Sequence, residues 1–147
     1  MKKIIGRIDK ADFPKLKLFD IDTKIDSGAY TSSIHCTQIE ECEEGGEMFI
    51  KFILLDPEHP HYNHKEFSSK NYTMRTVKSS NGQSEERFAI QTEIVLFGQS
   101  FPIDLTLSER KDMKFPILLG RKFLNHNFVI DPSKTNVSYK LKRTLHQ

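Results

Sequence analysis

Thr23-Lys24-Ile25-Asp26-Ser27-Gly28-Ala29 is the stretch of this sequence that says most about its fold. Apolar and polar residues alternate up to Asp26, as they do in a strand, and three small residues follow. Glycine lets the backbone approach a neighbouring segment closely, and the Ser27 hydroxyl can hydrogen-bond near the carboxylate and hold it. The pattern predicts a carboxylate at the end of a strand, presented to a cavity by a tight turn of Ser27, Gly28 and Ala29.

A second motif lies near the other end of the chain and reads Phe115-Pro116-Ile117-Leu118-Leu119-Gly120-Arg121. This is an apolar strand of the buried type that ends at a glycine, and a short helix is predicted from residue 121 to about residue 127. The glycine allows close backbone packing at this point. The pocket around Asp26 is predicted to be walled by Ile117, Leu118 and Leu119.

Between these motifs the sequence reads as strands joined by turns. Asn81-Gly82 is a strong hairpin signal, because both residues accept positive φ at little cost. A second turn at residues 97–101 is followed by four apolar residues at a period of two, Phe101, Ile103, Leu105 and Leu107. Strands are predicted at residues 48–55, 71–78, 88–96, 101–107 and 128–130, with a last extended piece at 137–141. Residues 40–47 and 56–70 are predicted to be loops. Many short strands separated by turns favour a small β-barrel or sandwich.

The overall composition narrows the classes of protein further. A chain of 147 residues fits a single domain, predicted here as residues 1–147. A net charge of +2, with both signs interspersed, gives no basis for nucleic-acid binding. No apolar run approaches the ~18 residues that cross a membrane, and the N-terminus lacks the apolar region of a signal peptide. We therefore expect a cytoplasmic protein in which Cys36 and Cys42 are reduced.

Taken together, the motifs resemble those of the retropepsin-like aspartic proteases. That family has a D-[ST]-G-A loop, a flap hairpin and an I-[IL]-[LI]-G-R strand leading into a helix, and the corresponding parts occur here in that order. The resemblance implies a mainly β fold, a small closed acid-protease barrel with one short C-terminal helix. Residues 40–70 would be an inserted loop or hairpin region. By the same resemblance Asp26 is the catalytic residue, Gly120 and Arg121 are structural, and the flap lies at Ser80, Asn81 and Gly82.

The chain also resembles, more closely, a bacterial family labelled ATP-dependent zinc proteases. The shared motifs are Lys24-Ile25-Asp26-[ST]-Gly28-Ala29, Thr31-Ser32, Leu119-Gly120-Arg121 and Asp131-Pro132-Ser133. More recent interpretations treat that family as retropepsin-like and associate it with ATP-grasp ligases that add amino acids to protein tails. The resemblance therefore implies a peptide or protein substrate, with such a tail as a candidate, and an ATP-grasp ligase as a partner. It also implies that Arg121 makes an ion pair near a dimer interface, while Tyr30 departs from the family, which commonly has arginine there.

The chain contains a single Asp-Ser-Gly-Ala motif. An aspartic protease needs two carboxylates that share one proton, because two like charges held close together cannot both ionise. We therefore expect a symmetric homodimer, in which the partner chain supplies a second Asp26 across a twofold axis. One carboxylate would activate a water molecule and the other would protonate the substrate carbonyl.

Two other functions stay open on the residues alone. The same barrel could bind a peptide or a partner protein without catalysis, although a pure binding module has no need for a costly pair of close carboxylates. A zinc peptidase would use His59, His61 and His64, which fall in a predicted exposed loop. A weaker ligand set is Asp26, His35, Cys36 and Cys42, because the two cysteines lack the usual zinc spacing.

Zinc and ATP are implied only by the label of the resembling family. The sequence has no H-E-x-x-H zinc motif and no G-x-x-x-x-G-K-[ST] phosphate loop. It also lacks the G-x-S-x-G motif of serine hydrolases. We therefore expect no cofactor.

Overall fold

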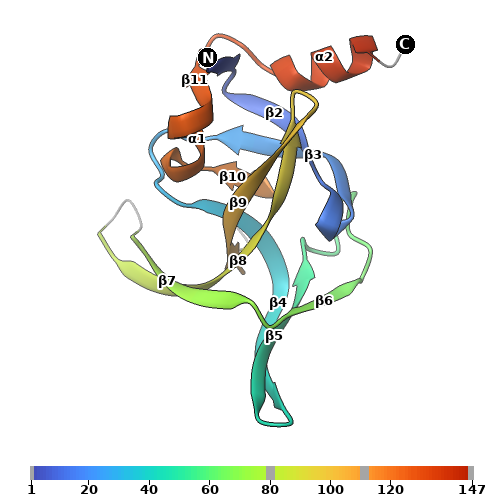
Figure 1. Ribbon diagram of the computed structural model, residues 1–147, viewed down its shortest axis with the longest axis vertical. Coiled ribbons are helices and arrows are strands. Elements are labelled where there is room, and N and C mark those ends of the chain that lie inside the picture. Colours follow the sequence, from blue (N-terminus) through green and yellow to red (C-terminus); the bar gives the residue numbers. More distant parts are fainter. Residues whose placement is uncertain (1, 79–81, 110–112, 146–147) are drawn as a thin grey trace.

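The computed structural model of the protein describes residues 2–78, 82–109 and 113–145 (Figure 1). The strands are β1 Lys3–Ile5, β2 Ile8–Phe13, β3 Leu18–Ile25, β4 Ser32–Glu44, β5 Glu47–Leu54, β6 Glu66–Ser69, β7 Tyr72–Lys78, β8 Ser84–Leu96, β9 Gln99–Ser108, β10 Ile117–Leu119 and β11 Phe128–Ile130. The helices are α1 Arg121–Asn127 and α2 Val137–Leu145, with a 3₁₀ turn at Pro14–Leu16. None of the helices in these described ranges is long and apolar enough to cross a membrane.

Most of the strands close into a ring. Hydrogen bonding runs in the order β10-β3-β2-β8-β9-β4, and β4 pairs back with β10. The pairing of β2 with β8 is the shortest of these, with Asp12 opposite Val95. β7 joins the free length of β8, while β1 and β11 form a separate parallel pair. The mainly β fold and the ring of strands confirm the predicted fold class.

Strand β9 illustrates how the sequence pattern builds the interior. Its residues Ile103, Leu105 and Leu107 are buried, with exposed fractions of 5%, 0% and 2%. Pro102 and Asp104 alternate with them and face outward, as a strand with a period of two requires. The turn before β9 has Phe97 and Gly98 at φ of 54° and 70°, which is the positive-φ pair of a tight hairpin.

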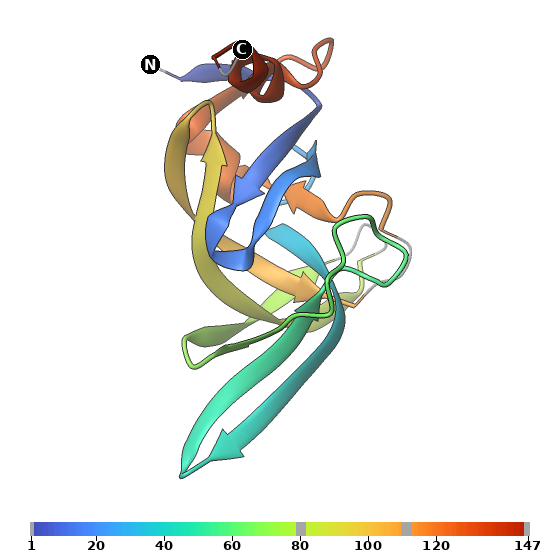
Figure 2. The ribbon, with the colours of Figure 1, turned by 90° about the vertical axis from the view of Figure 1, so that its right-hand side faces the viewer.

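The predicted loop at residues 40–47 was wrong, because this segment forms a long hairpin. β4 is buried at its beginning, inside the ring, and its second half pairs with β5 up to Glu44 opposite Glu47. Gly45 and Gly46 make the turn at φ of 59° and 82°. Figures 1 and 2 show this hairpin extending away from the ring. A Gly-Gly pair is itself a hairpin signal, and the acidic residues around it obscured that signal.

The predicted loop at residues 56–70 was also wrong in part. Its last residues form β6, which pairs with β5. Phe67 of β6 stacks on Phe52 of β5, with ring centroids 5.7 Å apart. The inserted region is therefore a three-stranded extension of the sheet, stabilised by an aromatic contact between residues that are distant in the sequence.

The prediction of an extended segment at residues 137–141, and of a single C-terminal helix, was wrong as well. Those residues begin α2, whose first backbone N–H groups are bound by a side chain from β2. The Asp9 carboxylate accepts hydrogen bonds from Ser138 N at 2.9 Å and Tyr139 N at 3.1 Å. Lys142 of α2 also contacts Asp12 at 2.9 Å and Asp20 at 2.7 Å. A helix that is capped from the far end of the chain leaves no local signal.

Replacing Asp9 by alanine should therefore lower the free energy of unfolding by about 2 kcal/mol, the upper range for loss of a helix cap. Asp9 is 1% exposed and also accepts Lys10 N at 2.8 Å. Asp22→Ala is the matched control, because Asp22 is exposed and pairs only at the surface with Lys10. Urea unfolding would measure both variants. An equal loss in the two would contradict the capping role of Asp9.

The effect of Asp9 on stability should also depend on pH. Burial raises the pKa of Asp9, and hydrogen bonds from Ser138, Lys10 and Tyr139 only partly oppose this. The folded state thus holds the proton more tightly than the unfolded chain. The stability contributed by this titration is fully present below the unfolded pKa and declines as pH rises through the folded pKa. The gap in unfolding free energy between wild type and Asp9→Ala should therefore narrow as the pH rises above about 4, the ordinary pKa of an aspartate.

Candidate active site

The loop that carries Asp26 begins where β3 ends. β10 runs parallel to β3, with Leu119 opposite Ile25, and Asp26 N donates to Leu119 O at 2.9 Å. The carboxylate Oδ1 of Asp26 accepts a hydrogen bond from Gly28 N at 2.9 Å. The backbone of the turn therefore orients the carboxylate, whereas the Ser27 residue beside it is exposed. Asp26 itself is half-buried, which leaves its carboxylate accessible at the surface of the chain.

The glycine that ends β10 packs against the same loop. A Cβ atom at Gly120 would lie 2.6 Å from Tyr30 O and 2.6 Å from Thr31 O, so no larger residue fits without movement of the backbone. Gly120 N also donates to the buried Ser32 Oγ at 3.0 Å. The close packing predicted for this glycine is thus packing against the residues that follow the Asp26 turn.

Helix α1 holds the loop from its N-terminal end. Arg121 N donates to Ala29 O at 2.8 Å, and Lys122 N donates to Tyr30 O at 3.0 Å. The Arg121 side chain donates to Ser27 O at 2.9 Å and lies over the Tyr30 ring at 5.8 Å. The two backbone bonds use N–H groups that the first turn of a helix leaves unpaired. The two sequence motifs are therefore in direct contact, while the ion pair of Arg121 near a dimer interface stays a prediction.

The residues predicted to wall the pocket lie at different depths. Ile117 and Leu119 are both 0% exposed and pack in the core. Within one chain they therefore lie beneath the Asp26 loop, on its core side, and do not line an open pocket. Leu118 is half-buried and lines a cavity of about 390 Å³ together with Lys24 and Phe115. Their contact with a substrate stays a prediction.

The predicted flap corresponds to the end of the β7–β8 hairpin. Ser80 and Asn81 lie outside the described residues. Gly82 has a φ of +85°, and the strands pair from Tyr72 opposite Ile90 to Lys78 opposite Ser84. Residues 72–78 of β7 and 84–90 of β8 therefore form a two-stranded arm, called the flap arm below, that extends out from the ring (Figure 1).

The histidines of the zinc alternative do not converge. His61 N donates to His59 Nδ1 at 3.1 Å, and the pKa of His59 is lowered by burial and by His61. His64 packs instead on Tyr62, at 4.5 Å between ring centroids. In the part of the chain that the structure describes, no three His, Cys, Asp or Glu side chains are placed to hold a metal ion.

The two cysteines are free and lie in different surroundings. Cys36 is buried in the core, and burial raises the pKa of its thiol, which disfavours the nucleophilic thiolate. Cys42 lies on the projecting hairpin. The second proposed ligand set, which combined these cysteines with Asp26 and His35, is therefore not brought together among the described residues.

Two residues of the site were not identified as site residues from the sequence. Ser32 binds the backbone at Gly120, and Tyr30 joins the Asp26 turn to α1 through its carbonyl and its ring. Thr31-Ser32 stands out in the sequence only as part of a shared motif, and Tyr30 only as a departure from it. Neither residue type carries a local signal for contacts with a helix some 90 positions later.

A closed ring of strands with an Asp-Ser-Gly-Ala turn braced by a Gly-Arg segment defines a retropepsin-like aspartic protease fold. The comparison with known families agrees with this class. Residues 4–140 match the RimB-like family, described as retropepsin-like aspartic endopeptidase RimB. The chain belongs to this family.

Curated relatives add a second observation. A Shewanella pealeana protein named "Probable alpha-L-glutamate ligase" is 38% identical over 138 residues, which are 91% of this chain and 29% of that protein. A Desulfotalea psychrophila protein of the same name is 36% identical over 132 residues, covering 90% of this chain and 28% of that protein. The chain thus spans less than a third of the length of these relatives.

Among solved structures, a Legionella pneumophila protein of unknown function has a similar fold. The TM-score is 0.73 at 26% sequence identity, and the match covers 94% of this chain and 99% of that one. The similarity therefore extends over nearly the whole of both chains.

Proposed function

We propose that this protein is an aspartic endopeptidase that acts as a homodimer, with Asp26 of each chain forming a shared dyad. One observation carries the proposal. The Asp26 carboxylate is accessible at a strand end and is held there by Gly28 N at 2.9 Å, on a loop that β10 and α1 brace from behind. A fixed and accessible carboxylate is the group that this chemistry needs.

The chemistry follows from two such carboxylates sharing one proton. The ionised carboxylate takes a proton from water as the water oxygen attacks the peptide carbonyl carbon, and the protonated one donates to the carbonyl oxygen. The tetrahedral intermediate then collapses, the C–N bond breaks and the leaving nitrogen takes up a proton. Because the two carboxylates are coupled, their apparent pKa values belong to the pair.

The surface around Asp26 supports a symmetric encounter. Ser27 and Gly28 are exposed beside the half-buried carboxylate, so the turn can approach the same turn of a second chain. A twofold axis near this loop would place the two Asp26 carboxylates side by side. Each chain would thereby receive the second carboxylate of the dyad from its partner. Arg121, already bound to Ser27 O, would lie next to that interface.

The proposed substrate is a protein tail that an ATP-grasp ligase has modified, with that ligase as a partner. The support comes from the relatives, which are named as alpha-L-glutamate ligases and contain a segment similar to this chain within a much longer polypeptide. A shared polypeptide keeps two activities at high effective concentration. We place this activity in the cytoplasm, where free Cys36 and Cys42 stay reduced.

The dimer requirement is testable without knowing the substrate in advance. Peptidase activity on a mixture of fluorogenic peptides would be measured over a wide range of protein concentration, alongside sedimentation of the same samples. Specific activity should rise with the fraction of dimer, because a single chain holds half of the dyad. A strict monomer, or a specific activity that is independent of concentration, would remove the shared dyad from the proposal.

A further inference from the structure

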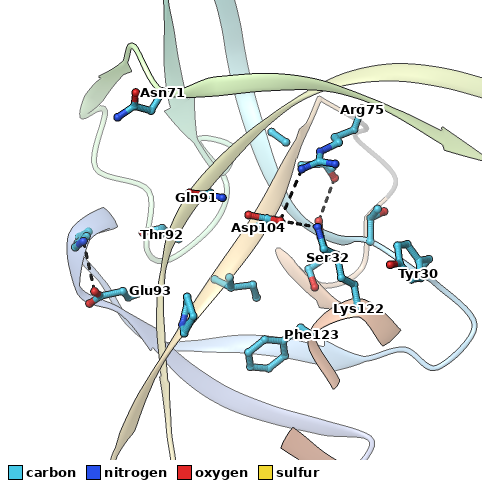
Figure 3. Close-up of a pocket in the computed structure, with 16 residues that line it drawn as sticks. Tyr30, Ser32, Asn71, Arg75, Gln91, Thr92, Glu93, Asp104, Lys122 and Phe123 are labelled. Atoms are coloured by element: carbon cyan, nitrogen blue, oxygen red, sulfur yellow. Dashed lines mark hydrogen bonds and ion pairs between the residues drawn. The ribbon is translucent and has the colours of Figure 1, made fainter. Parts of the chain in front are cut away.

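A cavity of about 570 Å³ lies beside the Asp26 loop, between the flap arm and the ring. Its walls come from β7, β8, β9, the start of β4 and α1, and the lining residues used here are Tyr30, Arg75, Asp104, Lys122 and Phe123. Figure 3 shows Arg75 and Lys122 both directed at Asp104, although they come from different elements. Nothing in the catalytic scheme above uses these side chains.

The cavity carries a surplus of positive charge. Lys15, Arg75 and Lys122 give three positive charges against two negative charges from Asp104 and Glu93, which leaves one. Lys15 and Glu93 pair with each other at 3.5 Å. Asp104 is shared between Lys122 at 2.7 Å and Arg75 at 3.8 Å. Two cations therefore meet a single carboxylate.

Asp104 stays ionised in this arrangement. Its burial alone would raise its pKa, but Lys122, Gln91 and Arg75 act against burial and lower the pKa overall. The Arg75 contact is long for an ion pair and its side chain is 44% exposed. The guanidinium has five N–H donors, so it keeps donors for a second acceptor that enters from the open side of the cavity.

We propose that Arg75 and Lys122 form a subsite that binds an acidic side chain of the peptide substrate, with Asp104 holding the two cations in place. A second carboxylate would complete two positive and two negative charges in a half-buried site. A carboxylate matches the fork of arginine donors. The inference rests on the proposed function, because it assigns part of the substrate of that same site.

The position of the cavity agrees with a subsite for a peptide. Tyr30 lines it and follows Asp26 by four residues, so their Cα atoms are at most ~15 Å apart. An extended peptide advances about 3.3 Å per residue. The acidic side chain would therefore lie within about four or five residues of the bond that is cleaved.

The rest of the lining favours a carboxylate on a short apolar stem. Phe123 and Ile103 are 6% and 5% exposed and form an apolar part of the wall. Methylene groups can pack there while the carboxylate reaches the cations. Arg75 lies on the flap arm and Lys122 on α1, so a bound carboxylate would also link the arm to the ring.

The test separates binding from cleavage. In the Asp26→Asn protein, fluorescence anisotropy would measure binding of a hexapeptide of glutamate and of the same hexapeptide of glutamine, both amidated and bearing a neutral fluorophore. We expect the glutamate peptide alone to bind. Arg75→Gln/Lys122→Gln should weaken that binding at least about tenfold.

The matched control is Lys140→Gln/Arg143→Gln, which removes the same two charges from exposed positions of α2. It should change the affinity less than about twofold. Equal weakening by both double variants, or equal binding of the two peptides, would overturn the subsite. Thermal unfolding of each variant shows whether it is folded. Because the binding protein is already Asp26→Asn, a failure of the subsite and a failure of the catalytic proposal give different results.

Discussion

The substitution Asp26→Asn is expected to lower the rate of peptide cleavage by at least about 10³-fold while the chain still folds. A carboxamide has nearly the shape of a carboxylate and can still accept the hydrogen bond from Gly28 N. It cannot take a proton from water or pass one to the substrate. Steady-state cleavage of a fluorogenic peptide, with the thermal unfolding midpoint of both proteins, would measure the two effects separately.

Asp22→Asn is the control for this substitution, since Asp22 lies on β3, the strand that leads into the Asp26 loop, with its side chain 58% exposed. It should cleave at the wild-type rate. A mixing experiment sharpens the test of the dyad. Excess Asp26→Asn protein added to wild type should reduce activity, because mixed dimers carry a single ionisable carboxylate. An Asp26→Asn protein that cleaves as well as wild type would end the aspartic-protease proposal, and a loss of activity with a chelator would favour a metal instead.

Gly120→Ala should destabilise the fold by about 3 kcal/mol, the range for overpacking at a rigid site. The added Cβ would meet two backbone carbonyls, Tyr30 O and Thr31 O, at 2.6 Å, and backbone atoms move less readily than side-chain ends. The loop from Asp26 to Ser32 must shift to make room. Cleavage by the folded fraction should therefore fall as well, which a comparison of chemical unfolding and specific activity would show.

Gly45→Ala separates this steric effect from the general cost of replacing a glycine. Gly45 has a φ of +59° and nothing within 4 Å of an added Cβ. Its substitution should cost about 1 kcal/mol for the left-handed backbone alone, at the tip of the projecting hairpin and without change in activity. A Gly120→Ala protein as stable and as active as wild type would mean that the loop from Asp26 to Ser32 can shift at little energetic cost. Gly120 would then not position Asp26.

Several elements were predictable because their signals are local. The alternation of apolar residues in β9 determines which face is buried. The turns at Phe97-Gly98 and before β8 each contain a glycine, Gly98 and Gly82, which accepts positive φ. Helix α1 has the predicted bounds, Arg121–Asn127. Residues 40–47 were wrongly predicted as a loop although Gly45-Gly46 also gives a local hairpin signal, because the acidic residues around it are typical of an exposed loop.

Local sequence patterns were sufficient to predict the carboxylate loop at Asp26, the strand that ends at Gly120, and β5, β7, most of β8 and β9 between them, since each depends on neighbours within a few residues. Three other features could be seen only in the folded chain. These are the closure of the ring through β10 and β4, the helix α2 capped by Asp9, and the cavity where Arg75, Asp104 and Lys122 meet. Each joins residues that are tens of positions apart, or more than a hundred. Their energies arise from contacts that exist only once the chain has folded, so no local pattern can encode them.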